Sequence, residues 1–169
     1  MNIESLRETI IQIYLFDGYP AALEGLLLLK EYIPSDSSPP PAETLNSHTL
    51  QRWIARGEAA CRLIYREKYS RLVNNINSLS PDLGKWMITE GYGKVLSRPG
   101  LELPVRELIN VAVLSVKFYP RQLYSHLLGC LHTGVPPEKI PEMLEAIESF
   151  APENTAAAKE LWRKLQNKP

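Results

Sequence analysis

The stretch that decides the fold class is residues 97–134, SRPGLELPVRELINVAVLSVKFYPRQLYSHLLGCLHTG. After the turn-forming SRPG segment, Pro104 suits the first turn of a helix, and apolar residues then recur at i, i+3, i+4 and i+7 spacing. Pro120 and Gly134 have positions typical of the start and the end of a second helix. The β-branched run at residues 111–116 has no second strand to pair with, so we predict an all-α protein.

Outward from this stretch, apolar periodicity and turn residues predict seven to nine helices in total. Residues 1–33 are expected to form a helix hairpin that turns at residues 17–20, DGYP, and residues 34–42 a Pro/Ser-rich linker. Residues 43–169 are expected to form the main helical domain. Shifted by 134 positions, the hairpin matches the apolar pattern near the C-terminus, as a partial repeat or as the common spacing of amphipathic helices. Further helices are predicted over residues 49–64, 69–76, 82–96 and 154–165, and from Pro137.

The composition is that of a soluble globular protein: 44% of residues are hydrophobic and 22% are charged. Lys plus Arg number 19 and Asp plus Glu number 19, so no excess of positive charge favours nucleic acid or a membrane surface as partner. The spacing of Cys61 and Cys130 fits neither a disulfide framework nor a metal site. The N-terminus, MNIESLRET, lacks the pattern of a signal peptide, so we expect a cytoplasmic protein.

Candidate chemistry lies on the predicted helices of the opening stretch. Tyr119, Gln122, His126 and Cys130 follow one another at spacings of three, four and four, which places them along one stripe of a helix. Glu107 lies in the first turn of the preceding helix, where a carboxylate also stabilises the helix dipole. If the two helices pack antiparallel, Glu107 and His126 approach each other; otherwise each is an ordinary structural residue.

Residues 90–109, EGYGKVLSRPGLELPVRELI, followed by residues 125–140, SHLLGCLHTGVPPEKI, resemble the carboxymuconolactone decarboxylase family. This family also contains thiol peroxidases of the alkylhydroperoxidase D (AhpD) type. The SRPGL, REL, HLxG and GxxPExI elements occur in the family's order. The resemblance implies an AhpD-like helical bundle that assembles as a homo-oligomer, a trimer or a hexamer. It also implies that Glu107 and His126 are the acid/base pair.

The peroxidase branch of this family has cysteines twelve and fifteen residues after the glutamate, where this chain has Tyr119 and Gln122. The decarboxylase branch lacks these cysteines. The resemblance therefore favours a lyase without cofactor or metal, which removes CO2 from a carboxylated unsaturated lactone such as carboxymuconolactone in the breakdown of aromatic acids. His126 would donate the proton, with Glu107 as its partner.

Three further residues are predicted to bind the small-molecule carboxylate substrate. Arg98 is the first choice for the carboxylate because a guanidinium group matches that anion, and Tyr119 and Gln122 are the other two. Two alternatives stay open: an AhpD-like oxidoreductase that uses the single thiol of Cys130, and a catalytically inactive oligomeric binding protein. The second is suggested by residues 150–158, FAPENTAAA, which depart from the family's pattern.

Overall fold

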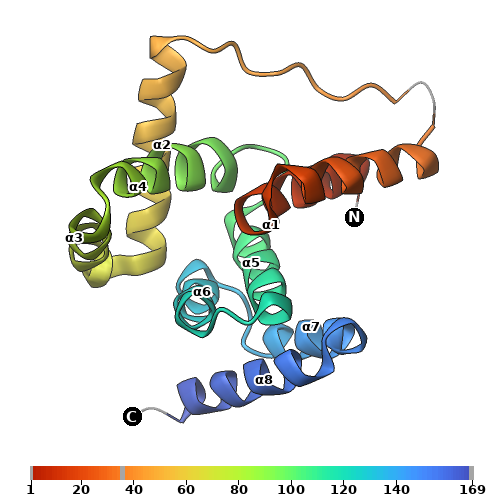
Figure 1. Cartoon of the computed structure of the whole chain (residues 1–169), viewed down its shortest axis with the longest axis vertical. Helices are drawn as coiled ribbons and strands as arrows, with labels where there is room; N and C mark the ends of the chain where they lie inside the picture. Colours follow the sequence, from red (N-terminus) through yellow and green to blue (C-terminus); the bar gives the residue numbers. More distant parts are fainter. Residues whose placement is uncertain (1, 35–36, 168–169) are drawn as a thin grey trace. The chain divides into compact units, whose positions relative to one another are not determined.

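The computed structural model describes residues 2–34 and 37–167, and over these residues the protein is helical without any β-strand (Figure 1). The all-α prediction is therefore confirmed. The described elements are α1 (Ile3–Tyr32), α2 (Ser47–Tyr65), η1 (Arg66–Lys68), α3 (Tyr69–Leu79), α4 (Pro81–Trp86), η2 (Met87–Leu96), α5 (Leu103–Lys117), α6 (Pro120–Thr133), α7 (Lys139–Ile147), η3 (Glu148–Phe150) and α8 (Pro152–Gln166). None of these helices combines the length and the apolar character needed to cross a membrane.

The chain forms two compact units. The first contains residues 1–62 and 66–102, and the second contains residues 63–65 and 103–169. The division near residue 102 falls inside the segment that the sequence predicts as one helical domain. The linker predicted for residues 34–42 has no regular secondary structure where it is described, and its residues 35 and 36 lie outside the described part.

Helix α1 is two helical halves joined at Gly18. This residue has φ 81° and ψ 173°, a backbone conformation that glycine adopts without strain, and Pro20 follows at the start of the second half. The two halves fold against each other. They approach so closely at Gly25 that a β-carbon there would lie only 2.9 Å from Cγ2 of Ile10. The turn lies where the DGYP residues predict it.

The first unit contains a close crossing of α2 and η2. A β-carbon at Gly57 would lie 2.2 Å from the carbonyl oxygen of Ile88, and one at Gly93 would lie 2.1 Å from that of Trp53. Only glycine permits this approach of two backbones. The prediction of an α-helix over residues 82–96 is correct only as far as α4, since the remainder, η2, is a π-helix. This rare, wider helix lies at the crossing, where the backbones touch.

The second unit packs α5 and α6 together, with α7 and α8 against them. Its core consists of aliphatic side chains that are at most 2% exposed, namely Val111, Leu114, Leu123, Leu127, Ile140 and Leu144. Burying one such side chain contributes about 1.5–3 kcal/mol to the stability. Gly134, with φ 91°, ends α6 in the left-handed conformation, as predicted. This packing holds α5 and α6 in a fixed register.

Candidate functional site

Glu107 and His126 meet inside the second unit. Oε2 of Glu107 on α5 lies 2.9 Å from Nδ1 of His126 on α6. Glu107 is 0% exposed and His126 is 6% exposed, so the contact is shielded from water. Charged or partly charged hydrogen bonds are stronger in such surroundings, because water does not compete for either group. The structure thus brings together the two residues predicted as the acid/base pair.

Asn110 completes this buried cluster. Its Nδ2 atom donates a hydrogen bond of 3.0 Å to Oε1 of Glu107 and lies 3.3 Å from Nδ1 of His126. A carboxylate only accepts hydrogen bonds, so both oxygens of Glu107 have a donor when Nδ1 of His126 carries a proton. This assignment places the other ring nitrogen, Nε2, in the role of proton donor or acceptor.

Gly129 provides the space for the carboxylate. A β-carbon at this position of α6 would lie 2.1 Å from Oε2 of Glu107 and 3.0 Å from Cγ2 of Ile64. Any side chain here would therefore occupy the space of the Glu107 carboxylate. Gly129 lies three residues after His126, so one helix supplies both the imidazole and the room for its partner.

Cys130 lies on the same helix but is poorly suited to thiol chemistry. Its side chain is 0% exposed. Burial and, to a smaller extent, the negative charge of Glu107 raise the pKa of the Cys130 thiol far above its ordinary value of 9.0. The nucleophilic form of cysteine is the thiolate, which these surroundings strongly disfavour.

The other predicted binding residues of α6 lie nearer to the surface. Tyr119 is the residue before the helix and is 52% exposed, and Gln122 in its first turn is also exposed. Neither belongs to the buried Glu107–His126–Asn110 cluster, and the binding of substrate by these two residues stays a prediction.

Arg98 belongs to the first unit, where it has an acidic partner. Its Nε atom lies 2.9 and 2.8 Å from the two carboxylate oxygens of Glu8, which is only 1% exposed. The ion pair offsets part of the cost of burying the Glu8 charge. Binding of the substrate's carboxylate by Arg98 stays a prediction. In this structure the positive charge of Arg98 is already balanced by Glu8.

Sequence reasoning missed Asn110 as a site residue and left Gly129 without a role. The sequence could have indicated Asn110, because it is a polar residue three positions after Glu107 on an otherwise apolar helix face. Gly129 lies within the HLxG element that carries the resemblance. Its role depends on how closely α5 and α6 approach each other, which spacing along the chain does not reveal.

Together, the fold and the site define an all-α protein with a buried carboxylate–imidazole pair between two packed helices. No family model matches the chain. Over 120 residues it is 28% identical to 4-carboxymuconolactone decarboxylase of Acinetobacter baylyi. The matched region covers 68% of this chain and 90% of the bacterial protein. The chain is 27% identical over 173 residues to Peroxisomal protein 2 of Saccharomyces cerevisiae, which covers 86% of this chain and 58% of the yeast protein. The chain is therefore a distant homologue of these two proteins, in agreement with the resemblance of its motifs to the carboxymuconolactone decarboxylase family.

Proposed function

We propose that this protein is a cofactor-free decarboxylase acting on a carboxylated unsaturated lactone such as carboxymuconolactone. The observation that carries the proposal is the 2.9 Å contact between Glu107 and His126 in a buried position. The bacterial decarboxylase named above, with which the chain shares 28% identity, supports the choice of reaction.

The reaction needs little from the protein beyond proton transfer and electrostatics. When CO2 leaves, the electron pair of the broken carbon–carbon bond delocalises into the lactone's conjugated carbonyl, which forms an enolate. A proton must then be delivered to carbon. In this proposal the imidazolium form of His126, protonated on both ring nitrogens, delivers the proton from Nε2 and is left as neutral imidazole, while Glu107 accepts the hydrogen bond from Nδ1 and so fixes the direction of the ring.

Asn110 and Gly129 act in this proposal as positioning residues. Asn110 holds the second carboxylate oxygen of Glu107, and Gly129 leaves the space in which that carboxylate lies. General acid catalysis by one well-placed group typically accelerates a reaction by about 10² to 10⁴. Arg98, Tyr119 and Gln122 are proposed to bind the substrate's polar groups, and the protein is proposed to work as a homo-oligomer.

The environment of Cys130 favours the proposed decarboxylase over a thiol peroxidase. Reduction of a peroxide by cysteine requires attack by a thiolate and then a second thiol to resolve the oxidised sulfur. Burial raises the pKa of the Cys130 thiol, and Tyr119 and Gln122 stand where the peroxidase branch has its cysteines.

The test is direct incubation of the purified full-length chain with 4-carboxymuconolactone and with the corresponding lactone lacking the conjugated double bond. We expect CO2 from the first compound, in proportion to enzyme concentration, and none above background from the second, which has no electron sink. The proposal would be overturned, and a non-catalytic binding protein favoured, if neither 4-carboxymuconolactone nor any other member of a panel of carboxylated unsaturated lactones released CO2.

A further inference from the structure

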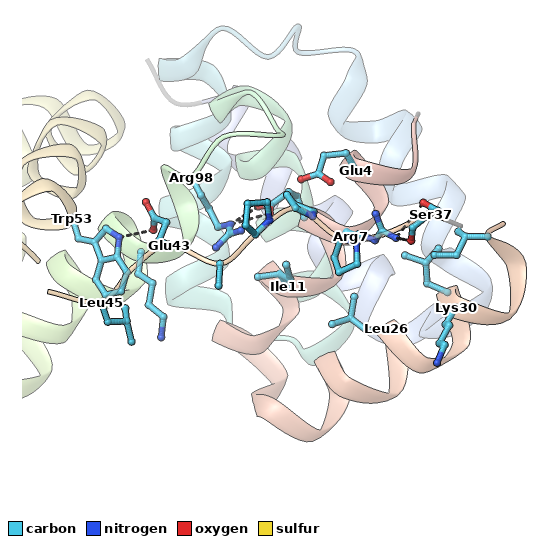
Figure 2. A pocket seen from close by; sticks show the side chains of 18 residues that line it. Glu4, Arg7, Ile11, Leu26, Lys30, Ser37, Glu43, Leu45, Trp53 and Arg98 are labelled. Atoms are coloured by element: carbon cyan, nitrogen blue, oxygen red, sulfur yellow. Dashed lines mark hydrogen bonds and ion pairs between the residues drawn. The ribbon is translucent and has the colours of Figure 1, made fainter. Parts of the chain in front are cut away.

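The first unit contains a cavity of about 550 Å³ that uses none of the residues of the Glu107–His126 cluster. Its walls come from both halves of α1, from the linker, from α2 and from η2 (Figure 2). This volume lies in the range of small-molecule sites in proteins. A second cavity of about 220 Å³ shares four lining residues with the first, namely Ile11, Leu26, Lys94 and Arg98, so the two adjoin.

The lining of the larger cavity is mainly apolar. Ile11 and Leu26 line its middle, and Trp53 and Leu45 lie at one end (Figure 2). Residues 39–41 of the linker, all proline, form part of the wall. Such a surface favours a ligand with an extended apolar body, because each buried methylene group contributes about 0.8 kcal/mol.

The linker is fastened over the cavity at two points. Nη2 of Arg7 donates a hydrogen bond of 2.9 Å to the carbonyl oxygen of Ser37, and Nε1 of Trp53 donates one of 2.8 Å to Oε2 of Glu43. Burial raises the pKa of Glu43, but the hydrogen bond from Trp53 and the charges of Arg56 and Arg52 outweigh it and keep the pKa below 4.5. The proline wall is thus held in place by bonds at both ends.

Most charges on the lining are already balanced. Arg98 is paired with Glu8, and Lys94 lies 3.3 Å from Glu90. Glu43 is paired with Arg52 and Arg56, which are not part of the lining.

Among the described residues of the lining, the remaining charges are Arg7 and Lys30 against Glu4, an excess of one positive charge. No carboxylate among the described residues lies within ion-pair distance of Arg7 or Lys30. Within the described part of the chain, Arg7 instead donates its hydrogen bonds to neutral groups of Ser37 and Ser38. Figure 2 shows Arg7 and Lys30 at the end of the cavity opposite Trp53.

We propose that this cavity binds an amphipathic carboxylate, an apolar chain or ring system bearing one terminal carboxylate. In this proposal the carboxylate binds at the end of the cavity that Arg7 and Lys30 line, and the apolar body extends past Ile11 and Leu26 toward Trp53. A guanidinium group and an ammonium group together satisfy a carboxylate by charge-assisted hydrogen bonds. This inference does not depend on the proposed decarboxylase activity.

The probe is decanoate, used below its micelle-forming concentration and titrated calorimetrically into the full chain. We expect saturable binding of one molecule per chain. Arg7→Gln and Lys30→Gln are each expected to weaken the binding about tenfold, as expected for the loss of one charge-assisted contact. The matched controls Arg71→Gln and Lys68→Gln, in exposed positions of the same unit, should bind as the wild type does.

Orientation is tested with 10-bromodecanoate, whose bromine quenches nearby tryptophan fluorescence. Quenching in the wild type and its loss in Trp53→Phe would support the proposed direction of the chain. Decan-1-ol, which lacks the charge, should bind more weakly than decanoate. Absence of saturable binding, equal affinity for the alcohol, or unchanged affinity in both the Arg7 and the Lys30 variants would overturn the proposal.

Discussion

Replacing Gly129 by alanine tests the geometry of the candidate site without removing any polar group. The new β-carbon would lie 2.1 Å from Oε2 of Glu107, far inside the ordinary contact distance between carbon and oxygen. Because Glu107 is fully buried, its carboxylate has to move by about 1 Å or the two helices have to separate. Either movement breaks the 2.9 Å contact with His126.

The expected loss of stability follows from opposing contributions. A hydrogen bond to a charged group contributes about 1.5–3 kcal/mol. Alanine is favoured over glycine within a helix by about 1 kcal/mol. We therefore expect Gly129→Ala to lower the free energy of unfolding by about 0.5–2 kcal/mol. Since a displacement of about 1 Å at a catalytic group can reduce the rate about 10²-fold, decarboxylation should fall by about that factor.

The assays are urea unfolding followed by circular dichroism and CO2 release from the carboxylated lactone. Gly91→Ala in η2 is the matched control, because the nearest atom to its β-carbon would be the carbonyl oxygen of Trp86, 4.0 Å away. This control should keep both stability and activity. A Gly129→Ala protein at least as stable and as active as the wild type would refute the described contact between Gly129 and the Glu107 carboxylate.

Three other predictions concern single groups. Glu107→Gln should reduce decarboxylation less than removal of His126 does and should change the pH profile of the rate, because an amide holds the imidazole without a negative charge. Cys130 should not react with a thiol reagent in the folded protein but should react after unfolding in urea, because burial raises its pKa and hides it from the reagent. The hydrogen bond from Tyr14, helped by Lys94 and opposed by burial, lowers the pKa of Glu90 below 4.5. The stabilisation from this group is therefore present above pH 4.5 and is lost as the pH falls through the lower pKa of the folded state. The measurement is the free energy of unfolding between pH 6 and pH 3, a range that brackets the ordinary carboxyl pKa of about 4.3. Over this range it should change less in Glu90→Gln than in the wild type.

Each of these has an outcome that contradicts it. An unchanged pH profile in the Glu107 variant would leave that residue a purely structural role. Rapid modification of the Cys130 thiol in the folded chain, or its loss under peroxide, would restore the thiol peroxidase as a candidate. Equal pH dependence of unfolding in Glu90→Gln and the wild type would show that the Tyr14 contact does not stabilise the folded chain.

Much of the fold is visible in the sequence because local signals agree with one another. Ser80 accepts a hydrogen bond from the backbone of Leu83, with Pro81 at the first position of α4, as the SP pair predicts. Gly18 and Gly134 end helical segments in conformations that suit glycine. These features depend on a few neighbouring residues, so single-sequence reasoning detects them.

Features that depend on tertiary packing were harder to predict. The π-helix η2 lies at the crossing of Gly57 and Gly93, which are 36 positions apart, so the periodicity of residues 82–96 alone suggests an ordinary α-helix. The Glu8–Arg98 pair joins residues 90 positions apart. Within the candidate site, spacing and resemblance predicted Glu107 and His126 as a pair, but the contacts of Asn110 and Gly129 with Glu107 depend on the relative position of two helices.

The most direct test of the account compares CO2 release by wild-type protein and by His126→Ala on the same carboxylated lactone, with circular dichroism to show that helix content is retained. Loss of the proton donor should reduce the rate by about 10² to 10⁴. Equal turnover by the two proteins would contradict the assignment of His126, and with it the proposal that the buried imidazole delivers the proton.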